Sequence, residues 1–120
     1  MACILVVDDE ATILSMIEDT LTDEGYVVTA VSSGTAALTW LTQHAADLLL
    51  CDQMMPGMLG AELCRQIQAT PAWATMRIIM MSAAGEGTIG DTCHYDHFLR
   101  KPFTLDQLSA AITTVLARPH

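Results

Sequence analysis

Apolar residues fall into two kinds of segment that alternate along the whole chain. One kind is a short, nearly uninterrupted run of aliphatic and β-branched side chains, too short for an amphipathic helix and without helical periodicity. Such runs are typical of strands that are covered on both faces of a parallel sheet. The predicted strands span residues 3–7, 26–31, 48–51, 77–81 and 96–99.

The other kind of segment repeats its apolar residues every three or four positions, as a helix with one buried face does. The first such segment carries Ile13, Ile17 and Leu21 on one side and ends at Gly25. Helices are predicted in this way at residues 11–24, 36–43, 59–69 and 105–116. Because parallel neighbouring strands need crossover connections, the alternation predicts an α/β fold with helices on both faces of a parallel sheet.

Residues 83–97 break this pattern. Gly85, Gly87 and Gly90 lie within six residues of one another, and each costs a helix about 1 kcal/mol relative to alanine. We therefore expect the helix between the fourth and fifth strands to be short, irregular or absent.

Composition narrows the class of protein. We expect the 120 residues to form one domain, residues 1–120, because this length is large enough to bury one core and too small for two. With 52% hydrophobic and 16% charged residues, the chain should fold. The net charge of −9, with five Lys and Arg in all, argues against direct nucleic-acid binding, because phosphate contacts need basic residues. The chain has no basic, signal-like start and no apolar stretch near the roughly 20 residues that span a bilayer. These features predict a cytoplasmic protein that binds no membrane.

Polar side chains stand at the carboxyl ends of the predicted strands: Asp8 and Asp9, Asp52, Ser82, and Lys101. All these ends lie along one edge of a parallel sheet, which is where open α/β sheets bind ligands. Carboxylates that share one place repel each other, and a hard divalent cation is the usual compensation. The three aspartates therefore predict a Mg²⁺ site at this edge.

Further groups suit phosphoryl chemistry at the same edge. The backbone carbonyl of Met54 is within plausible reach of the metal as another oxygen ligand. Lys101 adds a mobile positive charge and Ser82 a hydroxyl donor beside Asp52. An aspartate beside Mg²⁺, a lysine and a hydroxyl is the arrangement needed to form and hold an aspartyl phosphate.

Four motifs, each at a strand end, resemble the receiver domain of the two-component response regulators. They are Ile-Leu-Val-Val-Asp-Asp-Glu at 4–10, Asp-Gln-Met-Met-Pro-Gly-Met-Leu-Gly at 52–60, Ser-Ala-Ala at 82–84 and Lys-Pro-Phe at 101–103. The resemblance covers essentially the whole chain. It implies a doubly wound, flavodoxin-like sheet of five strands in the order 2-1-3-4-5 and a function in two-component signal transduction.

The resemblance also implies roles for single residues. Asp52 would accept a phosphoryl group from the phosphohistidine of a sensor histidine kinase or a phosphotransfer protein. Asp9, Asp52 and the Met54 carbonyl would bind Mg²⁺ directly, and Asp8 would act mainly through water. The chain would assist only its own phosphorylation and dephosphorylation, and would not be an enzyme for external substrates.

A conformational switch is implied in the same way. Lys101, joined to Pro102 by a cis bond, would pair with the phosphoryl group, and Ser82 would move to hydrogen-bond it. The rotamer of Phe98 would follow Ser82 and carry the signal to an output domain, an effector protein or a phosphorylation-linked dimer. We also hypothesise that residues 85–93 are mobile in the resting state and become ordered on activation or partner binding.

The same residues allow plainer interpretations. Asp8 and Asp9 could cap the first helix, and Phe98 could be plain core. At the level of the whole chain, the alternative is a pseudo-receiver that binds partners without being phosphorylated. A Mg²⁺-dependent phosphohydrolase is a third class, but it would more typically carry an Asp-x-Asp pair at one strand end.

Cysteine and histidine raise a separate question, that of zinc. Cys93, His94 and His97 lie near Asp91 and Asp96, but structural zinc needs four converging ligands and a short strand would send the two histidines to opposite faces. We therefore expect this group to be solvated. The four cysteines form no Cys-x-x-Cys pair, which favours small buried side chains in a reducing compartment: Cys3, Cys51, Cys64 and Cys93.

Residues beside the expected phosphate site suggest a long-lived modification. Met54 and Ala84 flank the site, and neither can orient an attacking water as an Asn or Glu could. We therefore expect slow loss of the phosphoryl group unless a phosphatase assists. Met54, Met55 and Met58 are interpreted as packing within the turn and not as a partner groove.

Overall fold

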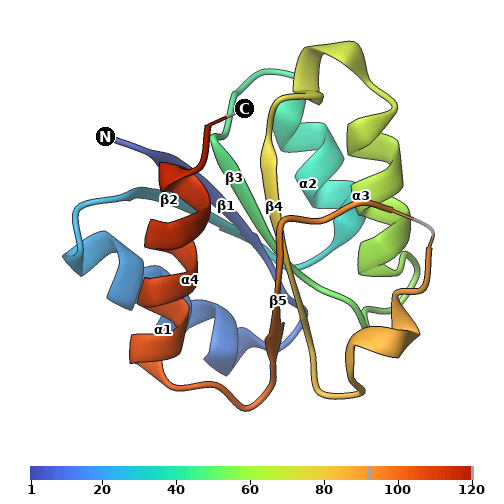
Figure 1. The fold of residues 1–120 in the computed structure, drawn as a ribbon. Helices are drawn as coiled ribbons and strands as arrows, with labels where there is room; N and C mark the ends of the chain where they lie inside the picture. Colours follow the sequence, from blue (N-terminus) through green and yellow to red (C-terminus); the bar gives the residue numbers. More distant parts are fainter. Residues whose placement is uncertain (92, 120) are drawn as a thin grey trace.

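The computed structural model describes residues 1–91 and 93–119, which form a five-stranded parallel sheet between two layers of helices (Figure 1). The strands are β1 (Cys3–Val7), β2 (Val27–Val31), β3 (Leu48–Asp52), β4 (Arg77–Ser82) and β5 (His97–Arg100). The helices are α1 (Ala11–Asp23), α2 (Gly34–Leu41), α3 (Gly60–Gln68) and α4 (Leu105–Ala117), with short 3-10 turns η1 (Pro71–Trp73) and η2 (Glu86–Thr88). The strand order β2-β1-β3-β4-β5 confirms the predicted doubly wound α/β fold.

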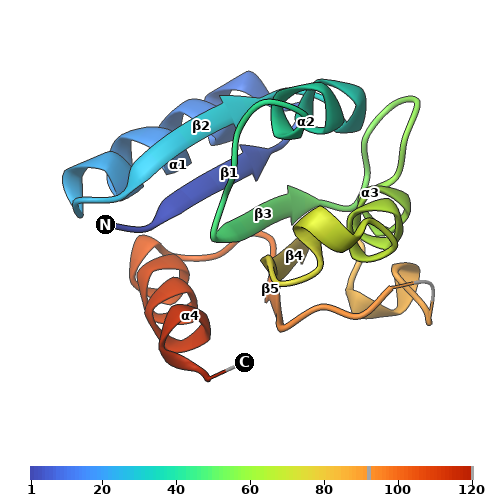
Figure 2. The same cartoon turned by 90° about the horizontal axis from the view of Figure 1, so that it is seen from above.

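Each face of the sheet has its own hydrophobic core. Helices α1 and α4 cover one face and α2 and α3 the other, as Figure 1 and the view from above in Figure 2 both show. Successive strand residues point to opposite faces, so Ile4 and Val6 join the core under α1 and α4, while Leu5 and Val7 join the core under α2 and α3. Strand β3 is buried over its whole length, which accounts for its uninterrupted apolar run.

The register of the central strands brings their ends to one level. Val7 pairs with Cys51, and Cys51 pairs with Met80. Asp8 follows Val7 directly and Asp52 follows Cys51, so the two carboxylates leave neighbouring strands side by side. The topology therefore positions the acidic residues before any side-chain contact is considered.

Helix α2 begins at Gly34, two residues earlier than the predicted start at residue 36. The reason is a side-chain cap, because Ser33 Oγ accepts a hydrogen bond from the Ala36 N–H at 3.1 Å and holds the first turn. Helix α1 ends at Asp23, one residue before the predicted end at residue 24, and Gly25 follows with a φ of 96° that favours glycine. Among the described residues, no helix is both long and apolar enough to cross a bilayer.

The connection between β4 and β5 contains one 3-10 turn, η2, and no α-helix within the described residues. The predicted weakening of this helix is therefore confirmed. Ile89 and Cys93 are nevertheless buried and pack into the core under α2 and α3. Mobility of residues 85–93 stays a prediction, and Thr92 within that range lies outside the described residues.

Candidate functional site

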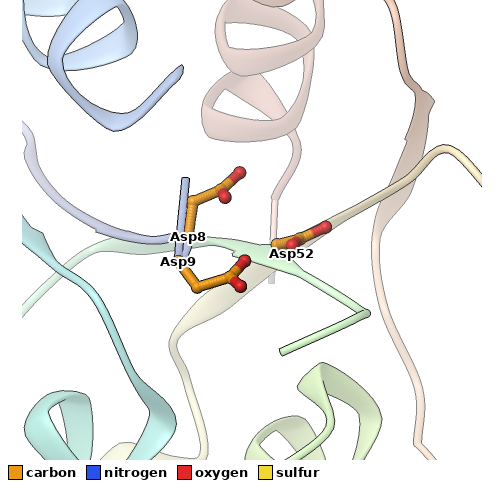
Figure 3. A group of neighbouring side chains, drawn as sticks. All are labelled: Asp8, Asp9 and Asp52. Carbon is orange, nitrogen blue, oxygen red and sulfur yellow. The ribbon is translucent and has the colours of Figure 1, made fainter. Parts of the chain in front are cut away.

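Three carboxylates meet at the carboxyl edge of the sheet (Figure 3). Asp8 and Asp9 follow β1, and Asp52 is the last residue of β3. One oxygen from each lies within 4.8 Å of the other two, and within the described part of the chain this is the group of side chains that could hold a metal ion. The structure thus brings together the three aspartates that the sequence predicted at this edge of the sheet.

The three carboxylates differ in burial. Asp8 is fully buried and Asp52 is only 4% exposed, whereas Asp9 is exposed to solvent. One oxygen of Asp8 accepts a hydrogen bond from the Glu10 N–H at 2.9 Å, and the other accepts one from Lys101 at 2.6 Å. Since the N-cap residue of α1 is Glu10, Asp8 does not cap that helix, and the plainer interpretation is wrong for this residue.

Lys101, which follows β5, is the cation of the site. Its Nζ lies 2.6 Å from Asp8 Oδ2, 3.3 Å from Asp52 Oδ1 and 3.6 Å from Glu10 Oε1. Burial lowers the pKa of Lys101, but the hydrogen bond to Asp8 and the charges of both aspartates outweigh burial, so the net pKa is raised. The bond to Pro102 is cis, as the resemblance implied. The part played by Glu10 was missed, although this residue lies within the first motif.

The ionised form of Asp52 is disfavoured by its surroundings, and the positive charge of Lys101 only partly compensates for this. Burial, and then repulsion by Asp8, raise the pKa of Asp52 to about 6, against the opposing effect of Lys101. A further positive charge beside Asp52, such as a metal ion, would stabilise its ionised form. The three side chains that could hold a metal ion all offer carboxylate oxygens, and Mg²⁺ binds preferentially to oxygen ligands.

Ser82 and Phe98 lie on neighbouring strands. Ser82 ends β4, is fully buried, and accepts a hydrogen bond at its Oγ from the Ala84 N–H at 3.1 Å. Phe98 pairs with Met80 in the β4–β5 register, so it is a diagonal neighbour of Ser82 on the same face of the sheet. Phe98 is half-buried against the core under α2 and α3. This placement allows a coupled movement, and the switch role itself stays a prediction.

The methionines of the β3–α3 loop behave differently from one another. Met55 is buried in the core, and Met58 packs against the same core beside Gly34. Met54 is 54% exposed, so the expectation of turn packing is wrong for this residue.

The expectation that the Cys93 group is solvated is also wrong in part. Cys93 is 6% exposed and His97 is half-buried, while His94 is exposed. Asp96 is engaged elsewhere, since its carboxylate accepts a hydrogen bond from the Ile78 N–H at 2.7 Å. All four cysteines are free, and burial raises the pKa of the Cys51 and Cys64 thiols, which keeps them protonated.

The sequence matches the family model of the response regulator receiver domain over residues 4–113. The chain belongs to the response regulator receiver family. A relative named sensory transduction protein RegX3, from Mycobacterium tuberculosis, is 30% identical, with 98% of this chain and 52% of the relative aligned. The phosphate regulon transcriptional regulatory protein PhoB of Rhizobium meliloti is 34% identical over 96% of this chain and 52% of its own length. The chain therefore spans about half the length of the relatives it matches.

Solved structures show the same receiver fold. A response regulator from Chloroflexus aurantiacus superposes with a TM-score of 0.90 at 31% identity, covering 98% of each chain. The response regulator TrrA from Thermotoga maritima, in complex with Mg²⁺ and BeF, gives a TM-score of 0.83 at 28% identity, covering 96% of this chain and 99% of that one. These likenesses confirm the flavodoxin-like architecture of this receiver domain.

Proposed function

We propose that residues 1–120 form a receiver that accepts a phosphoryl group on Asp52 in a Mg²⁺-dependent reaction and changes conformation to regulate a partner. The observation that carries this proposal is the convergence of Asp8, Asp9 and Asp52 within 4.8 Å, with Lys101 Nζ at 3.3 Å from Asp52 Oδ1. Carboxylates with one nearby lysine provide both a hard-metal site and a partner for the incoming phosphoryl oxygens.

The donor in this proposal is a phosphohistidine on a sensor histidine kinase or a phosphotransfer protein. The histidine N–P bond breaks, a bond forms between phosphorus and an Asp52 carboxylate oxygen, and the released histidine takes up a proton. Asp9, Asp52 and the Met54 carbonyl would hold the metal, with Asp8 acting through water. When bound, Mg²⁺ supplies charge neutralisation to the transferring phosphoryl oxygens. Asp8, already engaged with Lys101, is suited to orient that lysine.

The remaining groups respond to the new phosphoryl charge. Lys101 pairs with the phosphoryl group, and the Ser82 hydroxyl donates a hydrogen bond to it. The side chain of Phe98 then rotates into the space that the Ser82 side chain has left. The output is an attached domain, an effector protein or a phosphorylation-linked dimer, and the chain itself does not bind nucleic acid. Because the donor is made from ATP, the proposal includes a cytoplasmic location. Catalysis is restricted to the chain's own phosphorylation and dephosphorylation.

Incubation with Mg²⁺ and acetyl phosphate tests the proposal directly. We expect the intact mass to rise by one phosphoryl group, and the rise to be lost with EDTA and in Asp52→Asn. Asp47→Asn is the matched control, because Asp47 lies at the other end of the same run and its carboxylate accepts a hydrogen bond from the Cys3 N–H. A native chain that binds its partners but never gains this mass would be a pseudo-receiver.

A further inference from the structure

Gln53, the residue directly after Asp52, is a buried amide at the junction of three elements. Its exposed fraction is 1%. Its backbone N–H donates to the Met81 carbonyl at 2.8 Å, and its own carbonyl accepts from the Gly60 N–H at 2.9 Å. The backbone next to the phosphoacceptor is thereby fixed to β4 and to the start of α3.

The side chain of Gln53 makes two further bonds in opposite directions. Its Oε1 accepts from the Ala61 N–H at 2.7 Å, which satisfies one of the unpaired amides at the start of α3. Its Nε2 donates to the Thr88 carbonyl at 3.0 Å, across 35 residues of sequence. One side chain therefore connects the start of α3 with residues 86–90, hereafter the η2 segment.

The η2 segment forms a turn closed on Gly85, and it is also bonded to Tyr95, whose hydroxyl donates to a carboxylate oxygen of Glu86. The Thr88 hydroxyl donates to the Gly85 carbonyl at 2.8 Å, and the Ile89 N–H donates to the Glu86 carbonyl at 3.1 Å. Buried Ile89 and the Gln53 bond attach the segment to the α3 side of the molecule. Gly85 precedes this turn and has a φ of 94°, a backbone conformation that favours glycine.

The phosphorylation site reaches this segment at a second point, through Ser82. The Ser82 hydroxyl oxygen now accepts the Ala84 N–H at 3.1 Å. If the hydroxyl turned to a phosphoryl group, residues 83–85 would lose that anchor. A shift of these residues toward the site would pull the η2 segment away from the position in which Gln53 holds it.

We propose that Gln53 is a positioning residue: its Nε2 bond to the Thr88 carbonyl holds the η2 segment in the resting state and opens when Asp52 is phosphorylated. This inference rests on the proposed function. A bond present only in the resting state opposes the switch, so its removal favours the phosphorylated form. The loss of one such hydrogen bond corresponds to about a fivefold gain in affinity for a phosphoryl mimic.

Two variants separate the bonds of Gln53. Gln53→Glu, at mildly alkaline pH, keeps an acceptor for the Ala61 N–H at the start of α3 but removes the donor to the Thr88 carbonyl. Gln53→Leu removes both bonds and adds no charge. Gln68→Glu is the matched control, because Gln68 ends α3 and its side chain bonds to both backbone groups of His94, in the same connection between β4 and β5.

Fluorine NMR of bound beryllofluoride with Mg²⁺ measures affinity, and hydrogen exchange of the Thr88 and Ile89 amides measures the hold on the segment. In both Gln53 variants we expect affinity to rise about fivefold and ligand-free exchange to quicken by a similar factor, with neither change in Gln68→Glu. A merely structural role would weaken beryllofluoride binding or leave it unchanged.

Unchanged exchange in the Gln53 variants, or affinity at or below that of the native chain, would overturn the inference while leaving the proposed function in place. A native chain that binds no beryllofluoride at all would overturn the proposed function, and this inference with it. The two failures are therefore distinguished by whether the native chain binds beryllofluoride.

Discussion

Lys101 donates a hydrogen bond of 2.6 Å to Asp8, although 93 residues separate the two in sequence. The contact joins the end of β5 to the end of β1, across β4 and β3, and β3 is the strand that carries Asp52. The lysine is nearer to Asp8 than to Asp52, at 2.6 against 3.3 Å. Lys101 thus lies within ion-pair distance of both carboxylates, with Asp8 as its nearer partner.

Removal of this lysine should destabilise the metal-free fold. In Lys101→Met the buried carboxylates of Asp8 and Asp52 lose their compensating charge while the side-chain volume is nearly kept. We expect the free energy of unfolding to fall by about 3 kcal/mol without Mg²⁺, and part of this loss to return on addition of Mg²⁺. Urea unfolding with and without the metal measures both effects.

Arg65→Met is the matched control, because Arg65 is exposed on α3 and its removal should change stability by less than about 0.5 kcal/mol. Equal stability of Lys101→Met and the native chain in EDTA would contradict the electrostatic account of the site.

The raised pKa of Asp52 predicts a distinctive dependence of stability on pH. An aspartate with an ordinary pKa when unfolded and one of about 6 when folded binds its proton more tightly in the native state. Its ionisation therefore costs folding free energy, and this cost develops between about pH 4 and about pH 7. Without Mg²⁺, stability should fall across this window and level off above it.

The difference between the native chain and Asp52→Asn isolates this contribution from that of other titrating groups. We expect the variant to be more stable at neutral pH by about 1–2 kcal/mol without Mg²⁺, and the advantage to vanish near about pH 4. Urea unfolding over the pH series measures it, with Asp47→Asn as control. A difference that stays constant with pH would show that the carboxyl group titrates normally.

The sheet and the residues at its carboxyl edge could be predicted because they depend on the order of apolar and polar residues and not on side-chain contacts. Uninterrupted apolar runs indicate buried strands. Parallel pairing of these strands then brings Asp8 and Asp52 to one edge of the sheet, independently of the conformation of the loops. The start of α2 was harder to predict. Gly34 has a low helix propensity, which argues against a helix beginning there, but the Ser33 side chain stabilises the first turn.

Residues whose role depends on distant contacts could not be predicted. Gln53 follows a strand and precedes a turn, where a polar side chain is usually solvated. Its amide can be buried because two distant groups satisfy it, the Thr88 carbonyl 35 residues away and the Ala61 N–H. The nearer partner of Lys101 was missed for the same reason, since the choice between Asp8 and Asp52 depends on side-chain geometry.

Gly60 should be needed at the start of α3 because of a close backbone approach. A Cβ atom at this position would lie 2.3 Å from the Asp52 carbonyl oxygen, which must then move. We expect Gly60→Ala to lower the free energy of unfolding by about 2 kcal/mol and to slow phosphorylation of Asp52 by acetyl phosphate. Gly87→Ala is the matched control, because nothing lies within 4 Å of a Cβ there. Similar stability and phosphorylation rates in the two variants would contradict the importance of this contact.

The lifetime of the phosphorylated form should depend on two exposed positions beside the site. Met54 is 54% exposed and Ala84 is exposed, so polar replacements at both can be solvated without disturbing the core. Met54→Asn with Ala84→Glu adds groups that can orient a water toward the phosphoryl group, and we expect the phosphate to be lost about tenfold faster. Decay of the phosphorylated mass after removal of acetyl phosphate measures the rate. Met54→Leu with Ala84→Ser is the control, and equal decay in the two double variants would show that access of water is limited elsewhere.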